Sequence, residues 1–352
     1  MTDTASPAQS TASTYYDRLW DAVIAIDERR AVDTVLAALE EGVDPETVLL
    51  DVVGGVQRRI GAAWAANEIS VAQEHAATAI NERVVVTIGG QLPRPQQTRG
   101  RVTVACVDGE WHALPARLLA EVLSLRGFHV DYLGAQVPAP HLITHLHRTS
   151  PDVVALSGSI PTRLPVAHAT ITACQSAGVP VMVGGAAFGP GGRYASLLGA
   201  QAWAPDARAA ADRLAQGPLP RTSSHQPIDD LPHLADQEYT LVSRTSTQLV
   251  RTVFAGLEER LPEMRDYTDV QRQQTARDLA DIVDFLAAAL YVGEGSLLNS
   301  FVRWTADILA ARGVPAASLT PALSLLAAEL RDFPRATSLL ASAQAALAAH
   351  LS

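Results

Sequence analysis

The sequence predicts a protein of three parts: a small helical bundle, a doubly wound parallel sheet and an all-helical C-terminal region. Three observations predict this architecture. Apolar residues recur at three- and four-residue spacing from Tyr15 to about Gly90, which is the helical period. Five short apolar segments then alternate with helical segments, which is typical of a parallel sheet with right-handed crossovers. From about residue 235 the helical pattern returns.

The chain is long enough for more than one core, since it has 352 residues. Two segments rich in proline and glutamine, at residues 91–100 and 216–231, have the composition of linkers. The boundaries predicted from these segments are a disordered tail over residues 1–13, a bundle over 14–92, a sheet domain over 99–215, a linker over 216–234 and a helical domain over 235–352.

Composition excludes several classes of protein. Hydrophobic residues make up 48% of the chain and charged residues 18%, which describes a globular protein. The net charge of -10 argues against a general nucleic-acid surface. The N-terminus is polar and lacks a signal peptide, and no apolar run has the length of a membrane span. We therefore expect a cytoplasmic protein without a membrane partner, whose cysteines, Cys106 and Cys174, are buried and reduced.

Four helices are expected in the bundle. Asp44-Pro45-Glu46 combines an N-cap residue, a proline for the first helical position and an acid for the first turn. This motif predicts a third helix that runs to about Ala66. Ser70 is the expected cap of the fourth helix, which ends near Ile88, and four short-linked helices make a small bundle.

The sheet domain is expected to be Rossmann-like. Its five predicted strands are Val102–Val107, His129–Leu133, Val153–Ser157, Val179–Gly184 and Ala200–Ala204. The helices predicted between them are Pro115–Arg126, His141–Thr149, Leu164–Ala177 and Tyr194–Leu198. Open sheets of this kind bind ligands at the carboxyl ends of their strands.

The loop after the first strand carries the most informative residues. The stretch VTVACVDGEWHALP passes from a buried strand to an acidic, glycine-containing loop with one histidine, His112. A neutral imidazole suits a borderline transition metal, and a carboxylate such as Glu110 fixes the tautomer of the ring and improves it as a ligand. The alternative is a solvent-exposed loop histidine without a ligand.

The motif Glu110-x-His112, with Ser157-Gly158-Ser159 and Gly184-Gly185 after later strands, resembles the cobalamin-binding module of methionine synthases, mutases and related light sensors. The resemblance implies that His112 is the lower cobalt ligand and that Glu110 holds its other nitrogen. It also implies that Ser157 and Ser159 contact the nucleotide tail of the cofactor, which passes close to the backbone at Gly184 and Gly185.

In the predicted bundle, Trp64 precedes Glu74-His75 by ten residues. This spacing resembles the signature of light-sensing cobalamin-dependent regulators, in which a helical cap covers adenosylcobalamin and light breaks the cobalt–carbon bond. The resemblance implies that Trp64 lies over the adenosyl group with Glu74 and His75 beside it. Ala65 stands where those regulators have a further histidine. The alternative is a core tryptophan with a surface Glu-His pair.

The C-terminal domain has the size of a globin. With a cap bundle and a cobalamin sheet before it, the order of parts resembles the photocobilins, whose globin-like domain holds a bilin, biliverdin in the expected case. No cysteine follows Cys174, so a bilin would be bound without a thioether. Cations suit its propionates and aromatic rings its planar body. The candidate bilin contacts are Arg244, Arg251, Tyr291, Arg303 and Trp304.

The sequence thus indicates a photoreceptor that binds adenosylcobalamin and signals without turnover of a substrate, so it is not expected to be an enzyme. The residues before Tyr15 are too few for a DNA-binding module, and output is expected through an effector protein or a homodimer. Two alternatives stay open. One is a corrinoid methyl carrier that serves a methyltransferase, and the other is a cobalamin-only light sensor with a helical dimerisation domain.

Overall fold

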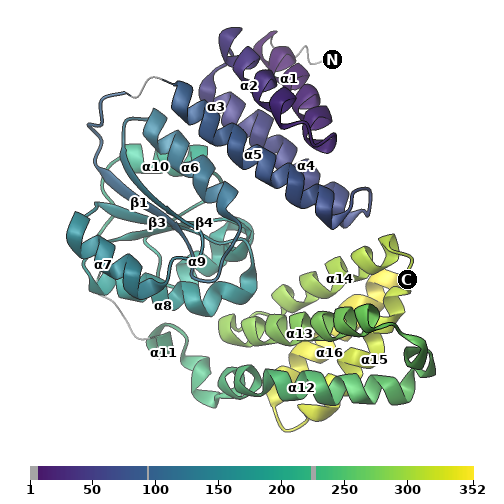
Figure 1. Cartoon of the computed structure of the whole chain (residues 1–352). Helices are drawn as coiled ribbons and strands as arrows, with labels where there is room; N and C mark the ends of the chain where they lie inside the picture. The colour runs from purple at the N-terminus through teal and green to yellow at the C-terminus, as the bar shows by residue number, and fades with distance from the viewer. Residues whose placement is uncertain (1–6, 93–94, 223–226) are drawn as a thin grey trace, which may run out of the picture. The chain divides into compact units, whose positions relative to one another are not determined.

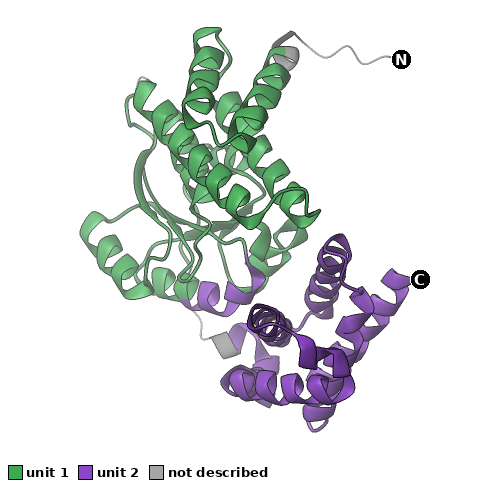
Figure 2. Ribbon diagram, turned by 45° about the vertical axis from the view of Figure 1, so that its right-hand side comes forward, with its two compact units in different colours: residues 1–159, 170–224 green, residues 160–169, 225–352 purple. Residues whose placement is uncertain are grey.

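The computed structural model describes residues 7–92, 95–222 and 227–352. Figure 1 shows the helices and strands, and Figure 2 divides the chain into two compact units. Unit 1 consists of residues 1–159 and 170–224, and unit 2 of residues 160–169 and 225–352. The bundle and the sheet therefore share one unit. Residues 160–169, which follow the third strand, are part of the helical unit.

Helices that cover most of residues 7–91 form the N-terminal part of unit 1. The elements are α1 (Pro7–Ile24), α2 (Glu28–Glu40), α3 (Pro45–Thr47), a π-helical segment (Val48–Val53), α4 (Gly54–Ala65) and α5 (Val71–Gln91). Because Val48 and Gly54 keep right-handed helical dihedrals, α3, the π-helical segment and α4 form one continuous helix. The predicted tail is wrong in part, since α1 begins at Pro7; residues 1–6 lie outside the described residues.

The two predicted helix starts in the bundle are confirmed. The Asp44 side chain accepts a hydrogen bond from the backbone N–H of Thr47 at 3.0 Å, with Pro45 in the first turn. Ser70 and Gln73 form a reciprocal capping box at the start of α5. Each cap satisfies backbone groups that a helix end leaves without partners.

The five-stranded parallel sheet is also confirmed, with the strand order β2-β1-β3-β4-β5. The strands are β1 (Arg101–Cys106), β2 (His129–Gly134), β3 (Val153–Ser157), β4 (Val181–Gly184) and β5 (Ala202–Ala204). The helices are α6 (Ala113–Leu125), α7 (Ala139–Thr149), α8 (Leu164–Ser176), α9 (Arg193–Leu197) and α10 (Ala207–Ala215). The chain reverses its direction of winding between β1 and β3, and ligands bind at such a switch point.

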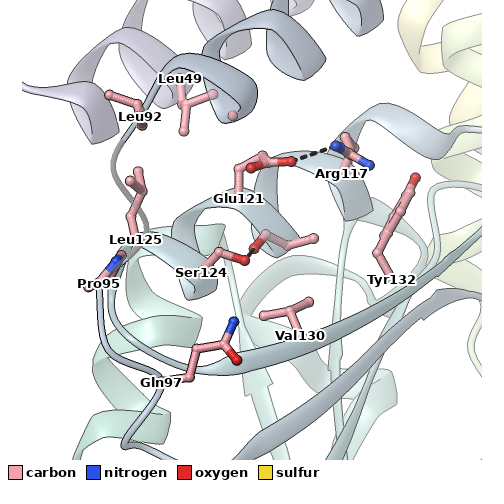
Figure 3. A pocket seen from close by; sticks show the side chains of 12 residues that line it. Leu49, Leu92, Pro95, Gln97, Arg117, Glu121, Ser124, Leu125, Val130 and Tyr132 are labelled. Carbon is pink, nitrogen blue, oxygen red and sulfur yellow. Dashed lines mark hydrogen bonds and ion pairs between the residues drawn. The ribbon is translucent and has the colours of Figure 1, made fainter.

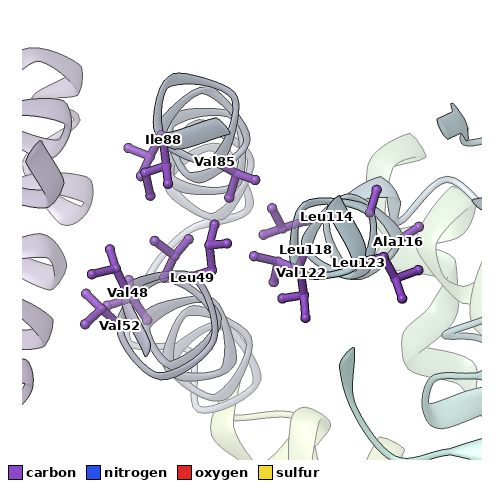
Figure 4. Packing of buried hydrophobic residues seen from close by; sticks show 14 of the residues in the cluster. Val48, Leu49, Val52, Val85, Ile88, Leu114, Ala116, Leu118, Val122 and Leu123 are labelled. Carbon is purple, nitrogen blue, oxygen red and sulfur yellow. The ribbon is translucent and has the colours of Figure 1, made fainter. Parts of the chain in front are cut away.

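A shared hydrophobic core joins the bundle to the sheet domain. Leu49 of the π-helical segment and Val85 and Ile88 of α5 lie opposite Leu114 and Val122 of α6 (Figure 4). All five side chains are buried, and each contributes about 1.5–3 kcal/mol by leaving water. The helix that follows the candidate loop is therefore packed directly against the bundle.

Ion pairs reinforce the same junction. Glu46 at the start of the third bundle helix accepts two hydrogen bonds from the Arg126 guanidinium, at 2.8 and 3.0 Å. Arg208 of α10 donates to the same carboxylate at 3.0 Å. The hydrogen bond from Arg126 lowers the pKa of Glu46 below its ordinary value. The carboxylate therefore stays ionised at neutral pH and stabilises the contact between bundle and sheet.

Unit 2 is mostly helical. Its helices are α11 (Pro227–Asp230), α12 (Glu238–Arg260), α13 (Asp269–Val292), α14 (Gly295–Ala311), α15 (Leu319–Glu329) and α16 (Pro334–Leu351). Gly293 ends α13 in the left-handed conformation, with φ of +72°. The predicted all-helical region is confirmed, and its globin-like class stays a prediction. Within the described ranges, no helix combines the length and apolarity needed to cross a bilayer.

The segment of residues 160–169 is tied into unit 2 by one buried histidine. His168 is fully buried; its Nδ1 lies 3.0 Å from the hydroxyl of Tyr291, and its Nε2 lies 3.0 Å from a carboxylate oxygen of Asp230. Buried polar groups of this kind stabilise a fold only when they are hydrogen-bonded. The start of α8 is therefore held by α11 and α13.

Candidate functional site

The loop after β1 presents Glu110 and His112. The N–H of Glu110 donates to the carbonyl of Val107 at 2.8 Å, in a turn where Gly109 has φ of +76°. The turn brings His112 to the N-cap position of α6, which begins two residues before Pro115, where the sequence predicted its start. The His112 side chain makes no cap hydrogen bond to the helix. Its ring is held by Glu110 instead.

Glu110 connects the loops after β1 and β3. One carboxylate oxygen accepts from His112 Nδ1 at 2.5 Å and from the His112 backbone N–H at 3.0 Å. The other accepts from the backbone N–H of Ser159 at 2.7 Å. Because the Nδ1–H group donates a hydrogen bond to the Glu110 carboxylate, Nε2 is the nitrogen that a metal ion would bind. Glu110 is fully buried, so its carboxylate is shielded from solvent, whereas the His112 side chain is 33% exposed.

The ionisation of Glu110 follows from these contacts. Burial raises the pKa of the Glu110 carboxyl. Hydrogen bonds from the His112 ring and from the backbone of His112 and Ser159 lower it by more, so that the pKa is about 2. Glu110 is therefore an anion at neutral pH. An ionised carboxylate on one ring nitrogen makes an imidazole a better metal ligand through the other.

His112 lines a cavity of about 290 Å³ that is shared with the bundle. The bundle contributes Gln57, Glu74, His75, Thr78, Ala79 and Glu82, and the sheet domain contributes Trp111, His112, Ala113, Leu114, Pro115 and Ser159. The structure thus brings the predicted cap residues Glu74 and His75 to the same cavity as the predicted cobalt ligand. Trp64 is not among the residues that line this cavity; it is partly buried and packs against the bundle core.

A chain of hydrogen bonds positions the bundle side of this cavity. Asn81 is fully buried and donates to Gln57 at 2.8 Å, and Gln57 donates to the hydroxyl of Thr78 at 2.8 Å. Thr78 donates to one oxygen of Glu74 at 3.0 Å, while the other oxygen lies 2.7 Å from His75 Nδ1. Residues inside the bundle therefore set the orientation of the Glu74–His75 pair.

A second cavity, of about 100 Å³, lies at the carboxyl ends of β3, β4 and β5. Ser157, Gly184 and Gly185 all line it, so three of the four predicted tail residues lie together. The fourth, Ser159, lines the His112 cavity. Pro115 lines both cavities, which makes them neighbours at the start of α6.

Glycine is required in this second cavity. Gly185 has φ of +99°, and a Cβ atom at this position would collide with the carbonyl oxygen of Gly158. A Cβ at Gly184 would lie 3.1 Å from the carbonyl oxygen of Ala204. Because no side chain covers the backbone at these positions, an elongated ligand can approach the main chain closely.

The five bilin candidates occupy different parts of unit 2. Arg244 and Arg251 are exposed on α12, and Arg303 and Trp304 are exposed on α14. Tyr291 is buried, with its hydroxyl 3.0 Å from His168 Nδ1. None of the five belongs to the apolar cluster of unit 2, whose side chains pack without room for a water molecule: Val250, Val253, Leu279, Ile282, Val283, Ala322 and Leu326. Four of the five candidates are thus exposed on two helices, and the fifth is buried beside His168.

A further cavity, of about 170 Å³, shares no lining residue with the His112 cavity (Figure 3). Arg117 and Glu121 form an ion pair of 2.7 Å on its wall, and the Arg117 guanidinium lies 5.0 Å from the centre of the Tyr132 ring. No residue singled out in the sequence lines it.

The structure adds three residues that the sequence analysis missed. Trp111 stands between the two motif residues and stacks on the His112 ring, with 3.9 Å between centroids. Gln57 and Thr78 line the same cavity from the bundle. A signal existed for Thr78, which stands four residues after Glu74 and therefore on the same helix face.

Comparisons with known proteins match unit 1. Residues 100–212 match a family model described as a B12 binding domain, and residues 15–88 match a second model with the same description. The HTH-type transcriptional repressor CarH of Myxococcus xanthus is 31% identical over 188 residues, which cover 51% of this chain and 60% of that protein. The trimethylamine corrinoid protein of Methanosarcina barkeri is 25% identical over 147 residues, which cover 41% of this chain and 68% of that protein.

Among solved structures, the monomethylamine corrinoid protein of Methanosarcina barkeri shares the fold, with a TM-score of 0.51, 20% identity, and coverage of 58% of this chain and 98% of that one. The matches thus cover the bundle and the sheet. This chain spans about three fifths of the length of the CarH repressor. The protein is a cobalamin-binding protein, related both to CarH-type repressors and to corrinoid proteins.

Proposed function

We propose that this protein is a light sensor in which unit 1 binds adenosylcobalamin, with His112 as the lower cobalt ligand, and unit 2 holds a bilin without a covalent bond. The observation that carries the proposal is the shared cavity. It places the Glu110–His112 pair of the sheet domain and the Glu74–His75 pair of the bundle on the walls of one space.

The residues of the chain fit the cofactor. Glu110 holds His112 Nδ1, which leaves Nε2 for cobalt, and an imidazole nitrogen suits this metal. The neighbouring cavity at Ser157, Gly184 and Gly185 suits the nucleotide tail, because the two glycines leave the backbone there uncovered by side chains. Bound adenosylcobalamin supplies a cobalt–carbon bond that light breaks.

The bundle side of the cavity is the proposed contact for the adenosyl group. Glu74 is held by Thr78 and offers carboxylate oxygens, which accept hydrogen bonds from hydroxyl groups. The part of Trp64 in this proposal depends on its sequence spacing alone, since it does not line the cavity. Ala65 has no ligand atom, and His75 is the imidazole that the bundle contributes to the cavity of His112.

A signal requires two states that differ in their contacts with the ligand. Loss of the adenosyl group would remove its contacts with Glu74 and His75. A route to unit 2 starts at Ser159, whose N–H is bound by Glu110, because the next ten residues, 160–169, are part of unit 2. We propose that output passes to an effector protein or through a homodimer, without substrate turnover.

Absorption spectroscopy tests the cobalamin part. Protein loaded with adenosylcobalamin in the dark should change its spectrum under green light, and His112→Ala should bind the cofactor weakly or with the cofactor's own base as the lower ligand. A spectrum that is stable to light would refute the sensor. A stable spectrum together with acceptance of a methyl group would establish the second candidate, a methyl carrier, which the shared fold with the monomethylamine corrinoid protein favours.

Co-expression with a source of biliverdin tests the bilin part separately. A far-red absorption band that co-elutes with the protein is expected, and Arg244→Gln with Arg251→Gln should weaken it because two cations for propionates are lost. Arg331→Gln is the control, since this arginine is 81% exposed and outside the candidate set. Absence of the band refutes the bilin and leaves the cobalamin site intact.

A further inference from the structure

Trp111 is the one residue between Glu110 and His112, and its environment is unusual for a tryptophan. The side chain is 49% exposed, although tryptophan is the largest apolar residue. It does not contribute to the shared core between bundle and sheet. It lines the cavity that contains His112 and His75. Hydrophobic burial therefore does not explain its position.

Its contacts are with two imidazole rings. The Trp111 ring stacks on His112, with 3.9 Å between centroids and 28° between planes. It also lies nearly parallel to the ring of His75, at 6.4 Å and 27°. The first distance is that of direct contact and the second is at the outer limit of aromatic interaction. Trp111 therefore acts chiefly on His112.

Two constraints then define the orientation of the His112 ring. The hydrogen bond to Glu110 fixes the direction of Nδ1, and hence the direction of Nε2 on the opposite side. The stacked indole covers one face of the ring and limits its rotation about the Cβ–Cγ bond. A ligand that is held in its binding orientation loses less conformational entropy when it binds.

We propose that Trp111 is a positioning residue for His112: its indole holds the plane of the imidazole so that Nε2 is directed at the cobalt of a bound corrinoid. This inference depends on the proposed function for its ligand. It assigns a role to the middle residue of the motif, and that role requires an aromatic ring rather than any residue of similar size.

The stack itself can be tested without cofactor. In protein labelled at histidine, the ring current of the indole should shift the carbon-bound protons of His112 upfield in the NMR spectrum. Trp111→Phe should keep most of this shift and Trp111→Ala should abolish it. Equal His112 shifts in all three proteins would overturn the proposal. This measurement stays decisive for the stack even if the protein binds no cobalamin, an outcome that would refute the proposed function instead.

The positioning role is tested with cob(II)alamin as the probe. In Trp111→Ala, the affinity should fall about two- to tenfold, the loss expected for one aromatic stack. The fraction of bound cofactor without nitrogen coordination from histidine, read by electron paramagnetic resonance, should rise. Trp111→Phe should restore both values. Val86→Ala is the control, because Val86 is 53% exposed on α5 and outside the cavity. Tighter or faster binding by Trp111→Ala would show that the indole obstructs the site, and would overturn the proposal.

Discussion

Replacement of Glu110 by glutamine tests the electrostatics of the site with the least change in shape. Glu110 accepts hydrogen bonds with both oxygens, from His112 on one side and from the N–H of Ser159 on the other. A glutamine amide has one oxygen and one NH₂ group. In Glu110→Gln, the NH₂ group must therefore face an N–H donor of either His112 or Ser159, in a fully buried position.

The size of the effect follows from the pKa of Glu110, which lies at about 2 against an ordinary value of 4.5. At about 1.4 kcal/mol for each pH unit of lowering, ionised Glu110 stabilises the folded state by about 3 kcal/mol. Because the folded pKa is the lower one, this stabilisation is complete above the unfolded pKa and is lost as the pH falls from about 4.5 towards 2. Affinity for cobalamin should fall about 10- to 100-fold, as for other residues that orient a metal ligand.

Denaturant unfolding of cofactor-free wild type and Glu110→Gln at a series of pH values measures the loss of stability. Titration with cobalamin measures the loss of affinity. The difference in free energy of unfolding should be largest at neutral pH and should shrink below about pH 4.5. Glu28→Gln is the control: its ion pair with Arg83 is at the surface, with side chains 50% and 66% exposed, and is worth under about 1 kcal/mol. Equal unfolding curves for wild type and Glu110→Gln at neutral pH would refute the reasoning.

Three further variants test other parts of the structure. Gly185→Ala should destabilise unit 1 by about 2–4 kcal/mol in thermal unfolding, because it adds a steric clash to the strain of a positive φ. Gly178→Ala is the control: Gly178 has φ of +78° but open space around it, so the loss should be only about 1–2 kcal/mol. Equal losses in the two variants would contradict the clash. Glu46→Gln should lower the free energy of unfolding by about 1–3 kcal/mol at neutral pH, and this difference from wild type should disappear as acid protonates the wild-type carboxylate. A difference that is unchanged in acid would count against the ion pair with Arg126. Tyr291→Phe should cost about 1 kcal/mol and speed hydrogen exchange in residues 160–169; unchanged exchange would mean that the hydrogen bond to the buried histidine does not hold this segment.

Local signals predicted much of the fold. The apolar β-branched runs gave the five strands, and the caps at Asp44 and Ser70 gave two helix starts, because both depend on residues close together in the sequence. Helix α10 was not predicted, although Asp206 caps it by accepting from Ala209 N at 2.8 Å. The segment lies within the predicted sheet domain, but its apolar residues are alanines and one leucine, and no helix was assigned to it.

The candidate site was predictable where it depends on spacing. Glu110 and His112 are two residues apart, and the loop after a buried strand places both at the ligand-binding edge. Thr78, the hydrogen-bond partner of Glu74, was predictable from its position four residues later on the same helix. Gln57, which donates to Thr78, was not, because it comes from another helix and the link is set by packing. The place of residues 160–169 in unit 2 was not predictable either. Their pattern shows the start of a helix, but it does not indicate that His168 is held by Tyr291, 123 residues later.

The central claim is that His112 coordinates cobalt, and electron paramagnetic resonance of bound cob(II)alamin tests it most directly. Protein is prepared with histidine that carries the heavier stable nitrogen isotope, while the cofactor is unlabelled. If His112 is the lower ligand, each cobalt line that is split into three in unlabelled protein should be split into two in labelled protein, and His112→Ala should lose this response. A three-line splitting that persists in labelled wild type would show that the cofactor's own base remains on cobalt, and would contradict the account.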